Sequence, residues 1–121
     1  KIPAMDRGFL YGDGLFETVR VVCGVPFRLD RHLERLSRAC DECLWGRSPD
    51  CGEIRRAVRT LLLKNQVTEG YLRITASRGP YSGNLTDLAA EEPTVLIDAR
   101  PMDLPALEAP RLMCWPDRLM S

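Results

Sequence analysis

The stretch from Tyr11 to Leu36, YGDGLFETVRVVCGVPFRLDRHLERL, constrains the fold more than any other part of the chain. Residues 15–22 are rich in β-branched and apolar side chains, which favours a strand. Cys23-Gly24 can turn the chain into a second short strand over residues 25–29, because glycine tolerates the positive φ of a tight hairpin. The stretch therefore predicts a β-hairpin that leads directly into a helix.

Two amphipathic helices are expected to follow this hairpin. The first begins at Asp30, which is a good N-cap, and runs to about Leu44. The second begins after Asp50, has Glu53 at the capping-box position and ends near Asn65. In the first helix, spacings of three and four residues predict one apolar face, formed by Leu33, Leu36, Cys40 and Cys43.

Two more strands are predicted in the second half of the chain. Residues 71–77 alternate between apolar and polar side chains, and residues 93–99 form a largely apolar run. The hairpin, the helices and these strands indicate an α+β domain over residues 1–100, with an antiparallel sheet and two helices. Pro101, Pro105 and Pro110 predict an interdomain linker, and residues 101–121 are expected to hold this linker and the possible start of a further domain.

The composition excludes several classes of partner. Lys+Arg and Asp+Glu both number 17, and a formal net charge of zero argues against a nucleic-acid surface. No apolar run reaches the length of about 18 residues that a membrane-spanning helix needs. An odd number of cysteines and no recognisable secretory signal favour reduced thiols and a cytoplasmic location.

A metal site is a weaker hypothesis than a packed core for the cysteines. Cys40 and Cys43, together with Cys51 and His32, supply ligand types that bind zinc. The spacing of the first pair is helical, however, and zinc motifs usually hold their cysteine pair in a turn. We therefore predict core thiols and no metal site.

Several motifs in order along the chain resemble those of one enzyme family. They are GDG-x-FET at residues 12–18, H-x-x-R-L at residues 32–36, Tyr71-x-Arg73 and Ser77-Arg78-Gly79. Together they resemble the opening of class IV (fold type IV) pyridoxal-phosphate enzymes. This family includes branched-chain aminotransferases, D-amino-acid aminotransferases and 4-amino-4-deoxychorismate lyase. The resemblance covers Asp6 to about Asn84 and implies the small N-terminal α+β domain of such an enzyme.

The resemblance also implies a cofactor-binding residue. In the family pattern, the arginine of the H-x-x-R-L element, here Arg35, binds the phosphate of pyridoxal 5'-phosphate. An arginine fork suits this task, because it offers parallel N–H groups to phosphate oxygens. His32, the single histidine, is expected to play a supporting structural role. An ion pair of Arg35 with Glu34 or Asp41 on a solvated helix is the alternative.

The substrate side is expected to involve more residues. In the family, residues matching Tyr11 and Phe16 wall the substrate pocket, and an amino-acid carboxylate needs an arginine or other donors. Tyr71-x-Arg73 resembles a motif of branched-chain aminotransferases, and Ser77-Arg78-Gly79 one of D-amino-acid aminotransferases. Arg20 and Arg73 also lie in predicted strands with apolar neighbours. Each arginine could instead form a surface or structural ion pair. The predicted substrate-binding residues are Tyr11, Phe16, Arg20, Tyr71, Arg73 and Arg78.

The resemblance implies an aminotransferase that uses an amino acid and a 2-oxo acid, and a homodimer. Family members carry the cofactor on a lysine of a second, larger domain. The lysines here are Lys1, which is terminal, and Lys64, which closes an amphipathic helix. We therefore assign no catalytic residue to this chain and expect it to be inactive alone. A lyase on the same scaffold and a non-catalytic interaction domain are the alternatives.

Overall fold

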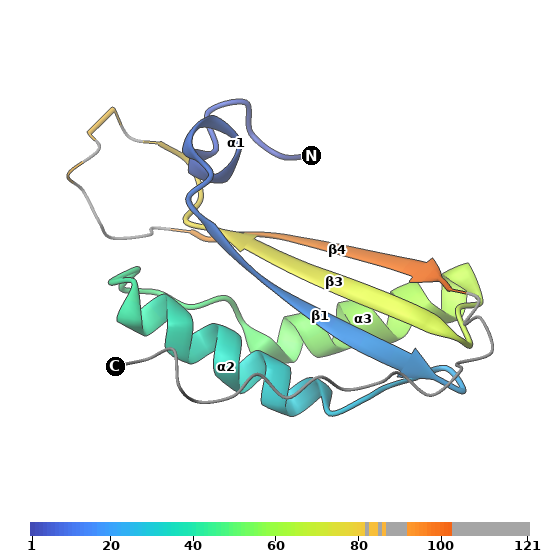
Figure 1. Ribbon diagram of the computed structural model, residues 1–121. Coiled ribbons are helices and arrows are strands. Elements are labelled where there is room, and N and C mark those ends of the chain that lie inside the picture. Colours follow the sequence, from blue (N-terminus) through green and yellow to red (C-terminus); the bar gives the residue numbers. More distant parts are fainter. Residues whose placement is uncertain (82, 85, 87–91, 103–121) are drawn as a thin grey trace, which may run out of the picture.

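The fold is an antiparallel sheet covered on one face by two helices (Figure 1). The computed structural model describes residues 1–81, 83, 84, 86 and 92–102. The sheet has four strands in the order β2-β1-β3-β4. In chain order the elements are α1 (Arg7–Tyr11), β1 (Gly14–Val22), β2 (Val25–Pro26), α2 (Leu29–Glu42), α3 (Cys51–Asn65), β3 (Gly70–Ser77) and β4 (Thr94–Pro101). The expected α+β class is confirmed.

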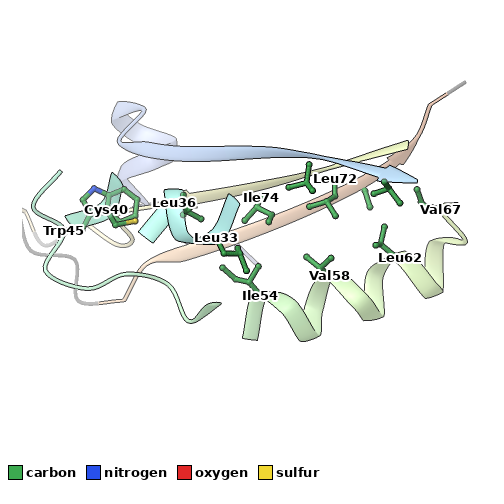
Figure 2. Packing of buried hydrophobic residues seen from close by; sticks show 14 residues of the cluster. Leu33, Leu36, Cys40, Trp45, Ile54, Val58, Leu62, Val67, Leu72 and Ile74 are labelled. Atoms are coloured by element: carbon green, nitrogen blue, oxygen red, sulfur yellow. The ribbon is translucent and has the colours of Figure 1, made fainter. Parts of the chain in front are cut away.

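The hydrophobic core lies between the sheet and helices α2 and α3. Alternate residues of β1 and β3 are buried because successive side chains of a strand point to opposite faces. Figure 2 shows side chains of α2 and α3 directed at this face of the sheet. The buried hydrophobic residues are Val19, Val21, Leu33, Leu36, Cys40, Trp45, Ile54, Val58, Leu62, Val67, Leu72, Ile74, Ala76 and Ala99.

The opposite face of the sheet is largely uncovered among the described residues, and we call it the open face. Helix α1 lies on this side at the end of the sheet where β1 begins (Figure 1). The strand register places Phe16 beside Thr75 and Arg20 beside Tyr71. Because antiparallel partners point to the same face, the side chains of β1 and β3 that are not in the core meet here.

The helix starts agree only in part with the sequence predictions. Asp50 caps α3 as predicted: its Oδ1 accepts hydrogen bonds from the amides of Gly52 and Glu53 at 2.6 and 3.0 Å. The prediction that Asp30 caps α2 is wrong, because Arg28 takes a left-handed conformation (φ 51°) and α2 begins one residue later. Asp30 instead accepts a hydrogen bond from Nε of Arg55 at 2.7 Å.

The structure also corrects the ends of two other elements. Cys43 is exposed and forms the C-cap of α2, so it does not belong to the predicted apolar face. Strand β2 ends at Pro26 and is shorter than predicted. The predicted linker and second-domain start after Met102, including Cys114, lie outside the described residues. None of the helices that the structure describes is long and apolar enough to cross a membrane.

Candidate cofactor and substrate site

The most concentrated polar cluster joins strand β1 to helix α2 through Glu17. Glu17 follows Phe16 in β1 and therefore points to the helix side, where its side chain is only 4% exposed. Its Oε1 accepts a hydrogen bond from Nε of Arg35 at 2.6 Å, and its Oε2 accepts one from Nη2 of the same residue. Nδ1 of His32 lies 2.7 Å from Oε2. One buried carboxylate thus bonds to both His32 and Arg35 of the H-x-x-R-L element.

The charge of Glu17 is stabilised by these two partners. Burial acts to raise the pKa of Glu17, but the hydrogen bonds from Arg35 and His32 outweigh it and lower the pKa below its ordinary value. The same bond raises the pKa of Arg35. Glu17 is therefore an anion at neutral pH, and its carboxylate orients the arginine fork.

Arg35 remains accessible although it is held. Its side chain is 63% exposed, in contrast to that of Glu17. The Glu17 bonds engage two of the five N–H donors that a guanidinium carries. A shallow basin of about 280 Å³ lies beside it, lined by Phe27, Arg28, Arg31, His32 and Arg35. The basic character of this lining suits an anionic ligand.

The open face carries several of the predicted substrate residues. Phe16 and Arg20 from β1, and Tyr71 and Arg73 from β3, share this face by register. The guanidinium of Arg73 lies over the Phe16 ring, 3.9 Å from its centroid, which is a cation–π contact. Both side chains are exposed, so the pair is available to a ligand.

Arg20 lies at the other end of this face. Its Nη2 donates a hydrogen bond to Oε2 of Glu69 at 3.2 Å. Oε1 of the same carboxylate accepts a hydrogen bond from the backbone amide of Cys23 at 2.7 Å. The Arg20 Nη1 atom is buried and has no hydrogen-bond partner within the described part of the chain. Arg20 is thus partly committed to the hairpin turn, and its role in substrate binding stays a prediction.

Tyr11 lies at the end of α1, and its neighbour Gly12, but not Tyr11 itself, is among the residues lining a groove on the open face. Its side chain is about half exposed, and its ring meets that of Tyr81 edge to face at 5.5 Å. The groove has a volume of about 590 Å³ and runs between the N-terminal segment with α1 and the sheet. Its largest apolar lining residues are Ile2, Phe9, Leu15, Phe16 and Leu96.

Arg78 is placed differently from the other predicted substrate residues. Its side chain is only 7% exposed, and its Nε donates to Oδ2 of Asp13 at 2.7 Å. Its Nη1 and Nη2 donate to the backbone carbonyls of Leu44 and Cys43 at 3.3 and 3.2 Å. These contacts at the end of α2 direct the guanidinium to the helix side of the sheet, away from Phe16 and Arg73. They favour a structural role over contact with a substrate.

The chain is similar in sequence and fold to known proteins. The family model for class IV amino-transferases matches residues 14–119. The chain belongs to this family. Aminodeoxychorismate lyase of Bacillus subtilis (strain 168) is 36% identical over 97 residues, which are 78% of this chain and 33% of that protein. D-alanine aminotransferase of Staphylococcus epidermidis is 35% identical over 79 residues, which are 65% of this chain and 28% of the relative. The chain thus spans about a third of these relatives.

Solved structures of class IV enzymes have the same fold. The 4-amino-4-deoxychorismate lyase from Pseudomonas aeruginosa matches with a TM-score of 0.69 and 29% identity, over 84% of this chain and 36% of the other. A hypothetical aminotransferase from Mycobacterium tuberculosis, in its PLP-bound form, matches with a TM-score of 0.67 and 30% identity, over 84% and 34%. The sequence-based resemblance to this family is confirmed.

The class IV residues present here fit the anionic end of pyridoxal phosphate. Arg35 offers an exposed guanidinium that a buried carboxylate holds in place, and phosphate is the kind of anion such a fork recognises. Phe16 and Glu17 are adjacent and point to opposite faces, so one strand separates Arg35 from the open face. Lys64 is exposed in the last turn of α3 and contributes to neither set of residues.

Glu17 is the residue that the sequence analysis missed. A signal was available, since a glutamate stands at the core-facing position between Leu15 and Val19 of an alternating strand. A buried acid needs cationic or donor partners. His32 and Arg35 of the H-x-x-R-L element are such partners, and the hairpin and helix bring them back to β1.

Proposed function

We propose that this chain is the N-terminal domain of a pyridoxal-phosphate-dependent enzyme that transfers an amino group between an amino acid and a 2-oxo acid. Membership of the class IV family supports the reaction type and the cofactor. The observation that carries the proposal is the Glu17–Arg35 pair, in which a buried carboxylate aims an exposed arginine. When bound, the cofactor supplies an electron sink for the amino-acid carbon that loses its proton.

In this proposal, Arg35 holds the cofactor phosphate and Glu17 fixes the angle of the arginine fork. The fork is restricted before any ligand binds, because Nε and Nη2 are both hydrogen-bonded to Glu17. Less side-chain entropy is then lost on binding than for a freely rotating arginine. His32 contributes by sharing the same carboxylate. The lysine that carries the cofactor would come from the part of the parent protein beyond this chain.

The open face supplies the substrate side in the same proposal. Arg73 is the first choice for the substrate carboxylate, because it is exposed and stacks on Phe16, while Tyr71 shares its strand face. Phe16 and Tyr11 would form apolar walls. Arg20 would contribute at the far end of the face, where Glu69 holds its guanidinium through Nη2.

A lyase acting on 4-amino-4-deoxychorismate is the second candidate. It is favoured by the 36% identity with aminodeoxychorismate lyase of Bacillus subtilis over 78% of this chain. The aminotransferase and the lyase would share cofactor, fold and most of this domain. They differ in the steps after proton removal, and residues near the cofactor lysine decide between those steps.

The test is an assay of purified full-length protein loaded with pyridoxal phosphate. We expect amino transfer from an amino acid such as D-alanine or a branched-chain amino acid to 2-oxoglutarate. Cleavage of 4-amino-4-deoxychorismate without such transfer would select the lyase. Neither activity, in a protein that is folded and binds the cofactor, would contradict both proposals. The isolated chain is the control and should be inactive.

A further inference from the structure

Asp13 lies between two buried arginines, Arg7 and Arg78, which have no part in the proposed cofactor and substrate site. Its Oδ2 is 2.7 Å from Nε of Arg78 and 3.0 Å from Nε of Arg7. The two arginine side chains are 7% and 9% exposed, whereas that of Asp13 is 23% exposed. Arginine is rarely buried to this extent unless it is paired, and Asp13 is an anion that both arginines contact.

Backbone hydrogen bonds fix the same junction. The amide of Arg78 donates to the carbonyl of Asp13 at 3.2 Å, and that of Arg7 donates to the carbonyl of Gly79 at 2.9 Å. The amide of Asp13 donates to the carbonyl of Arg7 at 3.3 Å. Helix α1 and the turn after it are therefore joined to the end of β3 by both side chains and main chain.

The close approach of α1 to β3 depends on small residues. A Cβ atom on Gly8 would lie 2.6 Å from Cβ of Ser77, so no larger residue fits without moving the helix. Gly79 has φ +93°, and a Cβ there would lie 2.2 Å from the carbonyl oxygen of Glu92. Gly8 thus lets α1 approach Ser77 at the end of β3, and Gly79 lets the chain after β3 pass close to Glu92.

The other arms of Arg78 reach the end of α2. They donate to the carbonyls of Cys43 and Leu44, and the guanidinium lies 5.4 Å from the ring centroid of the buried Trp45. Leu44 is left-handed, with φ 57°, a conformation that costs a leucine about 1–2 kcal/mol. The Arg78 side chain therefore bonds both to the strained turn at Leu44 and to Asp13 in the turn after α1, and so links the positions of the two turns.

We infer that Asp13, held by Arg7 and Arg78, is a positioning residue that fixes Tyr11 on the substrate side of the site. Tyr11 is the last residue of α1 and lies two residues before Asp13, so we expect a shift of this turn to displace its ring from the contact with Tyr81. Arg78 acts through Asp13 and does not touch the substrate. The inference rests on the proposed function for the role of Tyr11, but the placement of Tyr11 can be measured separately.

The kinetic test is a double-mutant cycle in the full-length protein, with Asp13→Asn and Tyr11→Ala made singly and together. Asp13→Asn should lower kcat/KM about tenfold and leave cofactor affinity unchanged. In the Tyr11→Ala background it should have little further effect, because the side chain it positions is gone. Equal effects in both backgrounds, or a lower melting temperature with unchanged kinetics of the folded fraction, would overturn the inference.

The structural test uses a single fluorotyrosine at position 11 and needs no activity. Asp13→Asn should shift or broaden the fluorine resonance, and Asp30→Asn should leave it unchanged. Asp30 is the matched control, since it accepts a 2.7 Å bond from Arg55 at an exposed site on other elements. An unchanged resonance in Asp13→Asn would contradict the positioning role.

A second variant guards against misfolding. Arg78→Lys keeps the positive charge but cannot reach Asp13 and both carbonyls at once, and it should shift the resonance in the same direction. A spectrum identical to that of the wild-type protein would count against the inference. A parent protein that shows these shifts but no pyridoxal-phosphate chemistry would contradict the proposed function and leave the positioning role standing.

Discussion

In the Glu17–Arg35 cluster the acid is the buried partner: the side chain of Glu17 is 4% exposed and that of Arg35 is 63% exposed. In the Asp13–Arg78 cluster the arginine is the more buried partner, because the side chain of Arg78 is 7% exposed and that of Asp13 is 23% exposed. Both clusters contain an arginine Nε that donates to a carboxylate oxygen at 2.6–2.7 Å. The bonds are alike, and the exposure of the arginine differs. An exposed arginine held by a buried acid can take a ligand, while a buried arginine held by an acid and carbonyls stabilises the fold.

The largest expected effect is on stability, at Arg78. Arg78→Met should lower the free energy of unfolding of the full-length protein by about 3 kcal/mol, because it removes one of the two arginines that pair with Asp13 and the side chain that donates to the carbonyls of Cys43 and Leu44. Unfolding in urea measures this change in the free energy of unfolding. Arg55→Met removes a bond of similar length at the surface and should have a much smaller effect. Similar losses for the two variants would break the comparison between buried and exposed arginines.

The next effect is on cofactor binding, at Arg35. Arg35→Ala should weaken binding of pyridoxal phosphate to the full-length protein about tenfold or more, because charge-assisted bonds to phosphate are lost. The fold should survive, since His32 still contacts Glu17 and the face carrying Leu33 and Leu36 is untouched. Cofactor titration is the measurement, with Arg38→Ala, an exposed arginine of the same helix, as control. Equal affinities for both variants would make Arg35 a structural partner of Glu17 only.

A smaller effect is expected on the open face. Arg73→Ala should lower kcat/KM for amino acids several-fold with unchanged cofactor affinity, because the contact to the substrate carboxylate is lost while the phosphate contact stays. Arg20→Ala should have a weaker kinetic effect, since its Nη2 is engaged by Glu69. Melting temperature, cofactor affinity and steady-state kinetics are measured together. Wild-type kinetics for both variants would remove the open face from the substrate site.

The smallest effect is a pH dependence that comes from Glu17. Its pKa is lowered from an ordinary value of 4.5, so its contribution to stability is fully present above about pH 4.5. The contribution is lost as the pH falls below 4.5 through the lowered pKa, where the folded protein also becomes protonated. The difference in unfolding free energy between wild type and Glu17→Gln should therefore shrink as the pH falls below about 4.5. A constant difference over this range would mean that the charge of Glu17 contributes nothing.

Local sequence patterns predicted most of the elements. Alternation identified β3, and spacings of three and four residues identified the buried face of α2, while capping chemistry identified the start of α3 at Asp50. One error falls where a residue has two competing uses. Asp30 has a side chain suited to an N-cap, but α2 begins at Leu29, after Arg28. Asp30 therefore lies in the first turn of the helix, where it accepts a hydrogen bond from Arg55. Helix α1 was missed, because a five-residue helix has too little periodicity to be recognised.

The candidate site was predicted to a different degree on each side of β1. Arg35 was identified from its motif, and the register of β1 with β3 brought Phe16, Tyr71 and Arg73 to one face as expected of alternating strands. Glu17 was missed because its partners are 15 and 18 residues away and return to it only through the hairpin and helix.

The sequence by itself determined the family, the α+β class and the residue types that could bind an anion, because these depend on short motifs and local periodicity. Only the tertiary structure decided which arginine is exposed. The partners of Arg78 are 65, 35 and 34 residues away in sequence, and burial depends on how elements pack after the chain has folded. Arg35 and Arg78 are chemically identical, and their opposite exposures come from the elements that surround them.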